Sequence, residues 1–192
     1  MAGFSQSPPT PGPRVAANLG KDGAMLIRPA TDADLAAVKA IYDHQVLTGV
    51  ATFDLEPPPE AYWRARFEST ETGDHLLVAT EDDAVLGYAY SASYRSRPAY
   101  SRTREASVYL ATEAIGRGIG RALYDDLLTR LRADGVHTVL AVIATPNPAS
   151  EALHRACGFE RVGVLPEVGH KFGRWIDTAF WSLVLEPGSG RA

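Results

Sequence analysis

The chain has 192 residues, of which 45% are hydrophobic and 22% charged, the balance of one globular domain long enough to bury a core. Its formal net charge of -4 argues against nucleic acid as a partner, because binding a phosphate backbone needs a basic surface. Its one cysteine, Cys157, excludes an internal disulfide. There is no apolar run of about 20 residues and no signal-peptide pattern. We therefore expect a cytoplasmic protein with small-molecule partners and no membrane partner.

The two ends of the chain differ in composition from the middle. Residues 1–24 are rich in Pro, Gly, Ser and Asn and offer few apolar side chains that would offset the entropy lost on ordering. The last residues, 187–192, have the same character. We expect a disordered N-terminal tail over 1–24, a folded domain over 25–186 and a flexible C-terminal tail over 187–192.

In the first half of the domain, a short strand over 25–30 precedes a helix that Thr31 caps and whose apolar residues recur at helical spacing. A loop then enters a second helix at the prolines of residues 57–59, which suit a first helical turn. Two strands over 75–82 and 84–94 follow, joined by a tight corner at Asp82 and Asp83. This pair is predicted to be a hairpin.

The second half alternates strands and helices. A strand over 104–112 precedes a helix over 118–135 that has leucines on one face and ends at Gly135. A buried strand over 137–145, a short helix over 148–158 and two last strands over 159–169 and 177–186 follow. The order predicts a mixed α and β domain of the α+β class, built on one largely antiparallel sheet.

The run GRGIGRAL, residues 116–123, is a glycine-rich turn at the start of a helix. Neither register of its glycines completes the dinucleotide pattern G-x-G-x-x-G, and no Lys-Ser or Lys-Thr pair follows as in a P-loop. Glycine amides at a helix N-terminus can still cradle a pyrophosphate. The alternative is a tight strand-to-helix turn without a ligand.

These motifs occur together in one known family. From IRPAT and VATFD, through RPAY, EASVYL, GRGIGRAL and NPAS..LH..CGF, to GHKFGRWIDTAFW, the chain resembles the GNAT superfamily of N-acetyltransferases. Within it, the chain is most similar to the branch of phosphinothricin and methionine sulfoximine or sulfone acetyltransferases. One departure is Ile115, where the superfamily has Gln or Arg. The resemblance implies a GNAT fold, with helices flanking a splayed sheet, and acetyl-CoA as co-substrate without a metal.

The resemblance also implies a cofactor site. The pyrophosphate would lie on the amides from Gly116 to Arg121, with Arg117 and Arg121 supplying charge in place of residue 115. The pantetheine arm would pair with the backbone of Val108 to Leu110, and amides near Tyr109 and Leu110 would hold the oxyanion. Asn147 would touch the cofactor arm, unless it is only a helix-entry residue. The full expected set is Val108, Tyr109, Leu110, Gly116, Arg117, Gly118, Ile119, Gly120, Arg121 and Asn147.

Two residues are candidates for catalysis. Glu105 of EASVY matches the proposed base of the branch, which would deprotonate the attacking amine. The alternative is a solvated glutamate at a strand end. His154 lies where many members place the acid that protonates the CoA thiolate, a role suited to imidazole near neutral pH. A structural helix histidine is the alternative.

Substrate binding is assigned to Arg97, Tyr100 and Phe53. Arg97 and Tyr100 belong to RPAY, which contributes to the amino-acid site of the resembled branch, and Arg97 would bind a carboxylate or oxyanion. Both could instead be exposed loop residues, and Phe53 could be a core residue. The histidines outside the catalytic pattern show no paired metal-ligand spacing, so no metal is expected.

The resemblance therefore predicts direct transfer of an acetyl group to the α-amino group of a small amino acid or analogue, an activity associated with herbicide resistance. A homodimer is expected, with the run GRWIDTAFW as contact surface. Two alternatives stay open. One is an N-acetyltransferase for another amine, such as a protein N-terminus, a polyamine or an antibiotic. The other is a regulatory module that binds acyl-CoA without turnover.

Overall fold

The computed structural model describes residues 15–17 and 25–185. Its helices are α1 (Leu35–Thr48), α2 (Glu60–Phe67), α3 (Ile119–Ala133) and α4 (Pro148–Ala156), with 3-10 turns at Asp32–Asp34, Pro98–Tyr100 and Thr112–Ala114. Its strands are β1 (Val15–Ala17), β2 (Met25–Pro29), β3 (His75–Glu81), β4 (Ala84–Ser93), β5 (Thr103–Leu110), β6 (Thr138–Thr145), β7 (Glu160–Lys171) and β8 (Arg174–Val184).

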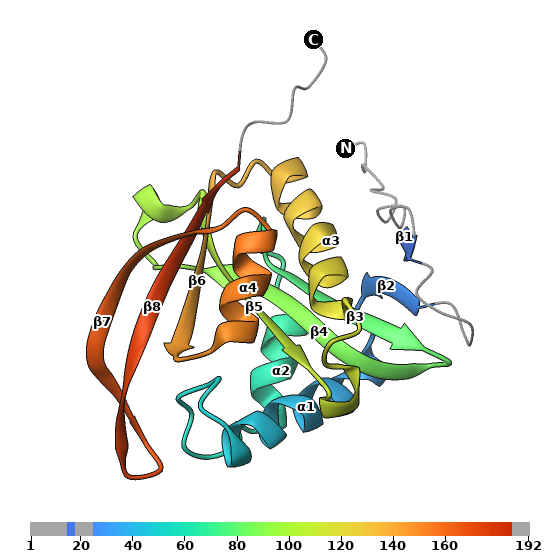
Figure 1. Cartoon of the computed structure of the whole chain (residues 1–192). Coiled ribbons are helices and arrows are strands. Elements are labelled where there is room, and N and C mark those ends of the chain that lie inside the picture. The colour runs from blue at the N-terminus through green and yellow to red at the C-terminus, as the bar shows by residue number, and fades with distance from the viewer. Residues whose placement is uncertain (1–14, 18–24, 186–192) are drawn as a thin grey trace.

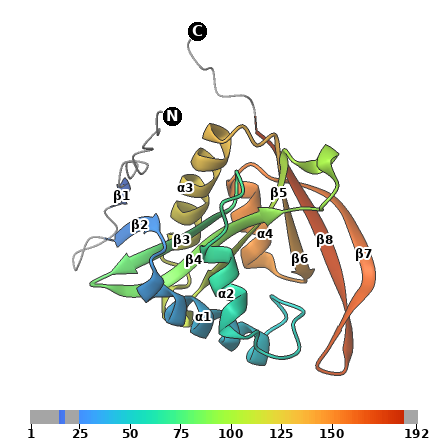
Figure 2. The same cartoon turned by 180° about the vertical axis from the view of Figure 1, so that it is seen from behind.

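Within the described residues, the strands form one sheet in the order β1-β2-β3-β4-β5-β6-β8-β7. Neighbouring strands run antiparallel except β5 and β6, which are parallel. Helices α3 and α4 cover one face of the sheet (Figure 1), and α1 and α2 cover the other (Figure 2). This mixed arrangement confirms the predicted α+β class.

The sheet is split at its centre. Strands β5 and β6 are in register over three residue pairs, the last of which joins Glu105 to Leu140. Beyond that pair β5 stays on β4 as far as Leu110, while β6 stays on β8 as far as Thr145. The two halves of the sheet therefore diverge (Figure 1), which confirms the predicted splay and leaves one backbone edge of each strand open.

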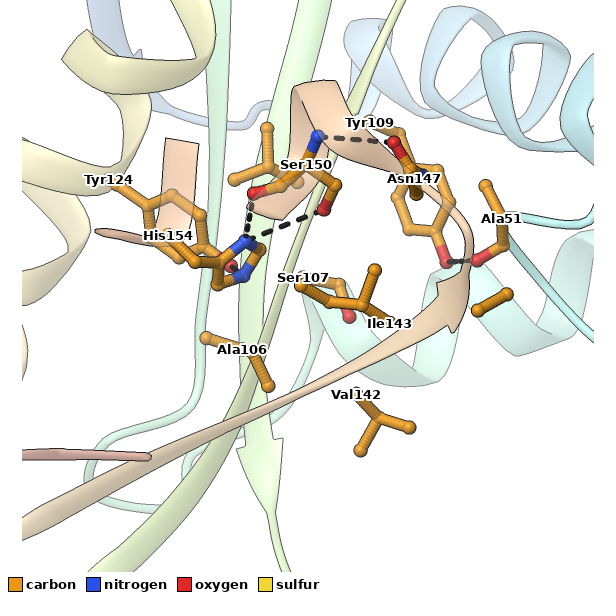
Figure 3. A pocket seen from close by; sticks show the side chains of 13 residues that line it. Ala51, Ala106, Ser107, Tyr109, Tyr124, Val142, Ile143, Asn147, Ser150 and His154 are labelled. Atoms are coloured by element: carbon orange, nitrogen blue, oxygen red, sulfur yellow. Dashed lines mark hydrogen bonds between the residues drawn. The ribbon is translucent and has the colours of Figure 1, made fainter. Parts of the chain in front are cut away.

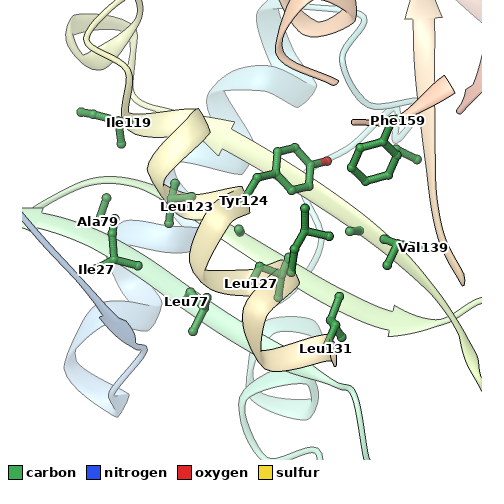
Figure 4. Packing of buried hydrophobic residues seen from close by; sticks show 14 of the residues in the cluster. Ile27, Leu77, Ala79, Ile119, Leu123, Tyr124, Leu127, Leu131, Val139 and Phe159 are labelled. Atoms are coloured by element: carbon green, nitrogen blue, oxygen red, sulfur yellow. The ribbon is translucent and has the colours of Figure 1, made fainter. Parts of the chain in front are cut away.

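Two cores hold the helices on the sheet. One lies under α3, whose buried stripe of Leu123, Leu127 and Leu131 packs on β3, β4 and β5 (Figure 4). The other lies under α1 and α2, where the ring of Trp63 meets Tyr42 and Tyr88 edge-on at centroid distances of 5.1 and 5.3 Å. The helical spacing of apolar residues in the sequence accounts for the buried faces of α1 and α3.

Every predicted helix and strand is present, with some bounds shifted. The corner between β3 and β4 is a two-residue turn in which Asp82 and Asp83 have φ angles of 48° and 65°, a conformation that suits such hairpins. Thr31 caps a 3-10 turn that leads into α1, and it forms a capping box with Asp34. Strand β1 falls within the segment predicted as a tail; the rest of that segment and residues 186–192 lie outside the described residues.

The last hairpin is longer than the sequence predicted. Strand β7 extends to Lys171 and β8 starts at Arg174, so the predicted limits at residues 169 and 177 were wrong. The turn is made by Phe172 and Gly173, with φ angles of 51° and 72°. Most of the seven residues between the two predicted strands, 170–176, are therefore strand residues that pair across the hairpin. The run GHKFGRWID thus forms the tip of a long hairpin.

Candidate active site

A cavity of about 120 Å³ lies in the fork between β5 and β6, on the side of α3 and α4 (Figure 3). Strand β5 contributes Ala106 to Tyr109, and β6 contributes Ala141 to Ala144. The remaining walls come from helices and one loop: Ala51, Tyr124, Asn147, Ser150 and His154. The cavity is therefore lined by both diverging strands, as a slot for an extended ligand requires.

The backbone of β5 offers hydrogen-bonding groups to this slot. The amide of Ala111 donates to the Leu86 carbonyl on β4 at 2.9 Å. Because successive residues of a strand point their polar groups to opposite sides, Tyr109 also faces β4, whereas Val108 and Leu110 face the fork. Of the amides near Tyr109 and Leu110 that were expected to hold an oxyanion, that of Tyr109 faces β4 and is not available, whereas those of Val108 and Leu110 face the fork.

A second cavity, of about 190 Å³, lies on the α1 and α2 side of the fork. It shares Ala51, Ser107, Tyr109, Val142 and Ala144 with the first cavity. Its other walls are Tyr42, Val50, Thr52, Phe53, Tyr90, Glu105 and Thr178. The two cavities thus meet through the split sheet, and a ligand from each side can reach the same shared residues.

Glu105 is a wall of this second cavity. Its side chain is half-buried, and burial raises the pKa of the carboxyl, while the nearby positive charge of Arg66 opposes that rise. The guanidinium of Arg66 lies over the rings of Tyr62 and Tyr90, with its central carbon 4.1 and 4.8 Å from their centroids. A carboxylate in this position can accept a proton from a bound amine.

His154 lies at the other end of the fork and is 5% exposed. Its Nδ1 lies 2.7 Å from the Ser150 carbonyl oxygen, which can only accept, so we assign the ring proton to Nδ1. Nε2 then accepts from the hydroxyl of Tyr124 at 2.8 Å (Figure 3). Burial lowers the pKa of His154 and favours this neutral form.

The glycine-rich turn has the geometry of an anion cradle. Gly116 and Gly118 have φ angles of 82° and 79°, which side chains rarely tolerate. Among the described residues, the amides from Gly116 to Gly120 donate to no other group. An added Cβ at Gly120 would lie 3.1 Å from Leu153, so this glycine also allows α3 to pack closely on α4. Free amides at a helix N-terminus favour an anion.

Two arginine side chains near this turn form ion pairs at the surface. Arg117 forms an ion pair with Glu81 at 2.6 Å, and Arg121 forms one with Asp125 at 2.8 Å. Ile115 is 60% exposed. The donors that the structure shows at this turn are backbone amides, and the supply of charge by Arg117 and Arg121 stays a prediction.

The remaining predicted residues divide into two groups. Asn147 lines the first cavity and also caps α4, with its Oδ1 accepting from the Ser150 amide at 3.1 Å, so it is a helix-entry residue, and its contact with the cofactor arm stays a prediction. Phe53 lines the second cavity. Arg97 and Tyr100 lie on the loop before β5, both exposed and outside the walls of either cavity, and the Tyr100 ring meets Tyr94 edge-on.

Sequence reasoning missed several residues at the site, above all Tyr124 and Arg66. A tyrosine on the buried stripe of α3 was the available signal, because a buried hydroxyl needs a partner. Cys157 ends α4, and burial raises its pKa to about 11, in keeping with a structural thiol. In the described part of the chain, no group of His, Cys, Asp or Glu side chains could hold a metal ion, and no helix is long and apolar enough to cross a membrane.

A split sheet with an anion cradle at one end and a half-buried carboxylate across the fork defines an acyl-transfer enzyme of the acyl-CoA type. Residues 27–180 match the family model of the acetyltransferase (GNAT) domain, and the chain belongs to this family. Membership confirms the resemblance and the predicted class of acetyl-CoA-dependent N-acetyltransferase.

Three relatives illustrate the match. The phosphinothricin N-acetyltransferase of Alcaligenes faecalis is 43% identical over 98% of this chain and 97% of its own length. An L-methionine sulfoximine/L-methionine sulfone acetyltransferase of Pseudomonas aeruginosa is 39% identical over 84% of this chain and 95% of its own. The solved structure of a Sinorhizobium meliloti phosphinothricin acetyltransferase in complex with AcCoA has a TM-score of 0.81 and 44% identity, covering 88% of this chain and 92% of that one.

Proposed function

We propose that the protein acetylates the α-amino group of a phosphinothricin-like or methionine sulfone-like amino acid by direct transfer from acetyl-CoA. The observation that carries the proposal is the half-buried carboxylate of Glu105 in a cavity that meets the donor slot through the split sheet. The names of the relatives support the acceptor class.

In this mechanism the two substrates approach from opposite faces of the sheet. The pyrophosphate of acetyl-CoA binds the amides of Gly116 to Gly120, and its pantetheine arm pairs with the exposed backbone of Val108 and Leu110. The acceptor enters the second cavity beside Phe53. For Arg97 and Tyr100 to bind its carboxylate or oxyanion, the loop before β5 would have to move toward the cavity, because both residues lie outside its walls. The acetyl group then lies among the residues that the two cavities share.

The reaction forms one C–N bond and breaks one C–S bond. Glu105, directly or through a water, takes a proton from the ammonium group, and the free amine attacks the thioester carbonyl. An amide of β5 that faces the fork stabilises the oxyanion. The nitrogen loses a second proton as the intermediate collapses, and the CoA thiolate gains one. No covalent intermediate on the enzyme is needed.

The leaving thiolate would be protonated from the side of His154. A neutral imidazole with its proton on Nδ1 has none to give at Nε2. We therefore propose that His154 acts with Tyr124. The second proton that the amine releases reaches sulfur through the Tyr124 hydroxyl, which takes up that proton and gives its own to sulfur, while His154 holds the hydroxyl through Nε2. Burial keeps the resting imidazole neutral.

The test is Glu105→Gln, with Glu68→Gln on the exposed end of α2 as the matched control. The dissociation constant for acetyl-CoA should change less than twofold, while kcat/KM for phosphinothricin or methionine sulfone should fall about 100- to 1,000-fold. Because a base acts only when deprotonated, wild-type kcat/KM should fall as pH drops below the raised pKa of Glu105. This acid limb should be absent in the Gln variant. An unchanged rate would remove Glu105 from the mechanism.

The same assay separates the alternatives. Thiol release with a protein N-terminal peptide, a polyamine or an antibiotic, but with no amino acid, would favour a different acceptor. Acetyl-CoA binding without thiol release for any amine would favour the regulatory module. Acetylation of phosphinothricin in cells that express the protein would also provide herbicide resistance, measured as growth on the compound.

We also propose a homodimer that forms through β7, an edge strand of the sheet. Its outer residues include Val162, Leu165 and Val168, which are 64%, 46% and 53% exposed, and Trp175 opposite its end is 63% exposed. An apolar edge of this kind is normally covered, and a second copy of the chain would cover it. The cytoplasm, where acetyl-CoA is supplied and a free thiol such as Cys157 stays reduced, is the proposed location.

A further inference from the structure

Phe53 forms part of the wall of the acceptor cavity and is held from outside by the β7–β8 hairpin. Its ring packs directly on the backbone of Gly169: a Cβ added there would lie 2.4 Å from Cζ and 2.5 Å from Cε2 of the ring. The backbone of Gly169 lies outside the left-handed region, so its conformation would accept any side chain. The ring of Phe53, and not the backbone, therefore requires glycine at this position.

A bulge in β7 brings this glycine to the ring. Leu165 pairs with Thr178 and Gly169 pairs with Ile176, so β7 has two more residues than β8 between these pairs. Glu167 within the bulge has a φ of 53°, and its amide donates to the Asp177 carboxylate at 2.8 Å. Beyond the bulge, Gly169 and Lys171 are buried, whereas the β7 residues before it are exposed.

Lys171 fixes the chain on one side of Phe53. Its side chain is among the buried polar groups, at 2% exposed, and its Nζ donates to the carbonyl of Thr52 at 2.9 Å. On the other side, the carboxylate of Asp54 accepts from the Tyr42 hydroxyl at 2.7 Å. That hydroxyl also lies 2.6 Å from the Thr52 side chain. Both neighbours of Phe53 are thus held by buried groups.

We propose that Gly169 and Lys171 position Phe53 and so determine how long an acceptor side chain the enzyme accepts. The proposal rests on the proposed function, because it takes the cavity beside Glu105 as the acceptor site. Gly169 leaves room for the ring to lie outside the cavity, against β7. Lys171 keeps the Thr52 carbonyl, and therefore the start of the Phe53 residue, in place. Neither residue touches the acceptor, so both are positioning residues.

The first test is Gly169→Ala, with Gly163→Ala on the same strand as control, since a Cβ at Gly163 meets nothing within 4 Å. The clash at Gly169 falls on the far edge of a partly exposed ring, so the ring moves toward the cavity at little cost to folding. The acceptors are methionine sulfone and S-methylcysteine sulfone, which is one methylene shorter. We expect kcat/KM for the longer acceptor to fall at least tenfold and that for the shorter one less than threefold, in line with the discrimination that one methylene provides.

Other readouts separate this effect from a general loss. The dissociation constant for acetyl-CoA and the melting temperature should stay at wild-type values in Gly169→Ala, and Gly163→Ala should match wild type throughout. Equal losses for both acceptors, or no loss, would overturn the proposal. If the wild type acetylates neither sulfone, the proposed acceptor class fails instead. In that case a crystal structure of Gly169→Ala still tests the positioning role. A Phe53 ring found in its wild-type position would refute it.

The second test compares Lys171→Met with Lys171→Arg. The methionine variant fills a similar volume but cannot donate to the Thr52 carbonyl. We expect it to raise KM for methionine sulfone at least fivefold with a smaller change in kcat, and to leave acetyl-CoA binding unchanged. Arginine retains a hydrogen-bond donor, so Lys171→Arg should keep at least half of the wild-type kcat/KM for methionine sulfone that Lys171→Met loses. A loss of kcat alone, or no recovery by arginine in a folded variant, would contradict the role of Lys171.

Discussion

Replacing Asp34 with Asn tests how the first helix is anchored. The Asp34 carboxylate accepts two hydrogen bonds from Arg28, at 2.7 and 2.9 Å, and two from the amide and hydroxyl of Thr31, both at 2.7 Å. The side chain is 6% exposed. These donors, led by the hydrogen bonds from Arg28, hold the pKa of Asp34 at about 2, below its ordinary 3.8.

The magnitude follows from proton linkage. A carboxyl with this lowered pKa contributes about 2.5 kcal/mol to the free energy of unfolding at neutral pH. Because the folded-state pKa is the lower one, the contribution is complete above pH 3.8 and is lost as pH falls toward 2. At pH 3, about half of it should remain. Asn keeps the shape of the side chain but cannot ionise, so it removes this term.

The assay is urea unfolding between pH 7 and pH 3, followed by tryptophan fluorescence, with Asp82→Asn in the exposed β3–β4 turn as control. Asp34→Asn should be less stable than wild type by about 2.5 kcal/mol at pH 7, and by about 1 kcal/mol at pH 3. The control should differ little at either pH. A deficit that stays constant across this range, or one below about 0.5 kcal/mol, would refute the argument from ion pairing.

Two further predictions concern the core and the edge of the sheet. Tyr124→Phe leaves the buried Nε2 of His154 without its donor, which should cost about 1–3 kcal/mol and lower the melting temperature by about 2–10 °C. An unchanged melting temperature would show that the hydrogen bond contributes nothing. Val162→Glu on β7 should convert a dimer to a monomer in light scattering, whereas Leu47→Glu, equally exposed on α1, should not. A wild-type protein that is monomeric at all concentrations would contradict the dimer.

Local patterns predicted the elements well because their causes are local. The leucine stripe of α3 and the tight corner at Asp82 and Asp83 each follow from a few neighbouring residues. The hairpin tip from His170 to Ile176 was missed for two reasons. Its strand residues do not alternate between apolar and polar, and its turn uses Phe172, a residue type that rarely takes a positive φ.

The site was predicted less completely, because its contacts join distant parts of the chain. Glu105 and His154 do lie on the two cavities of the fork. Tyr124 could not be paired with His154 from the sequence, since 30 residues separate them. The direction of the Tyr109 amide depends on the register between β4 and β5, which no residue type reveals.

The proposed binding of acetyl-CoA between β5 and β6 would also stabilise the fold. An unpaired strand edge inside a sheet leaves backbone groups open, and the acetyl-CoA pairing proposed above would complete the ladder. Any ligand that binds the folded chain alone adds to its stability in proportion to the logarithm of its concentration. Under the proposed function, the supply of acetyl-CoA would therefore affect the lifetime of the enzyme as well as its rate.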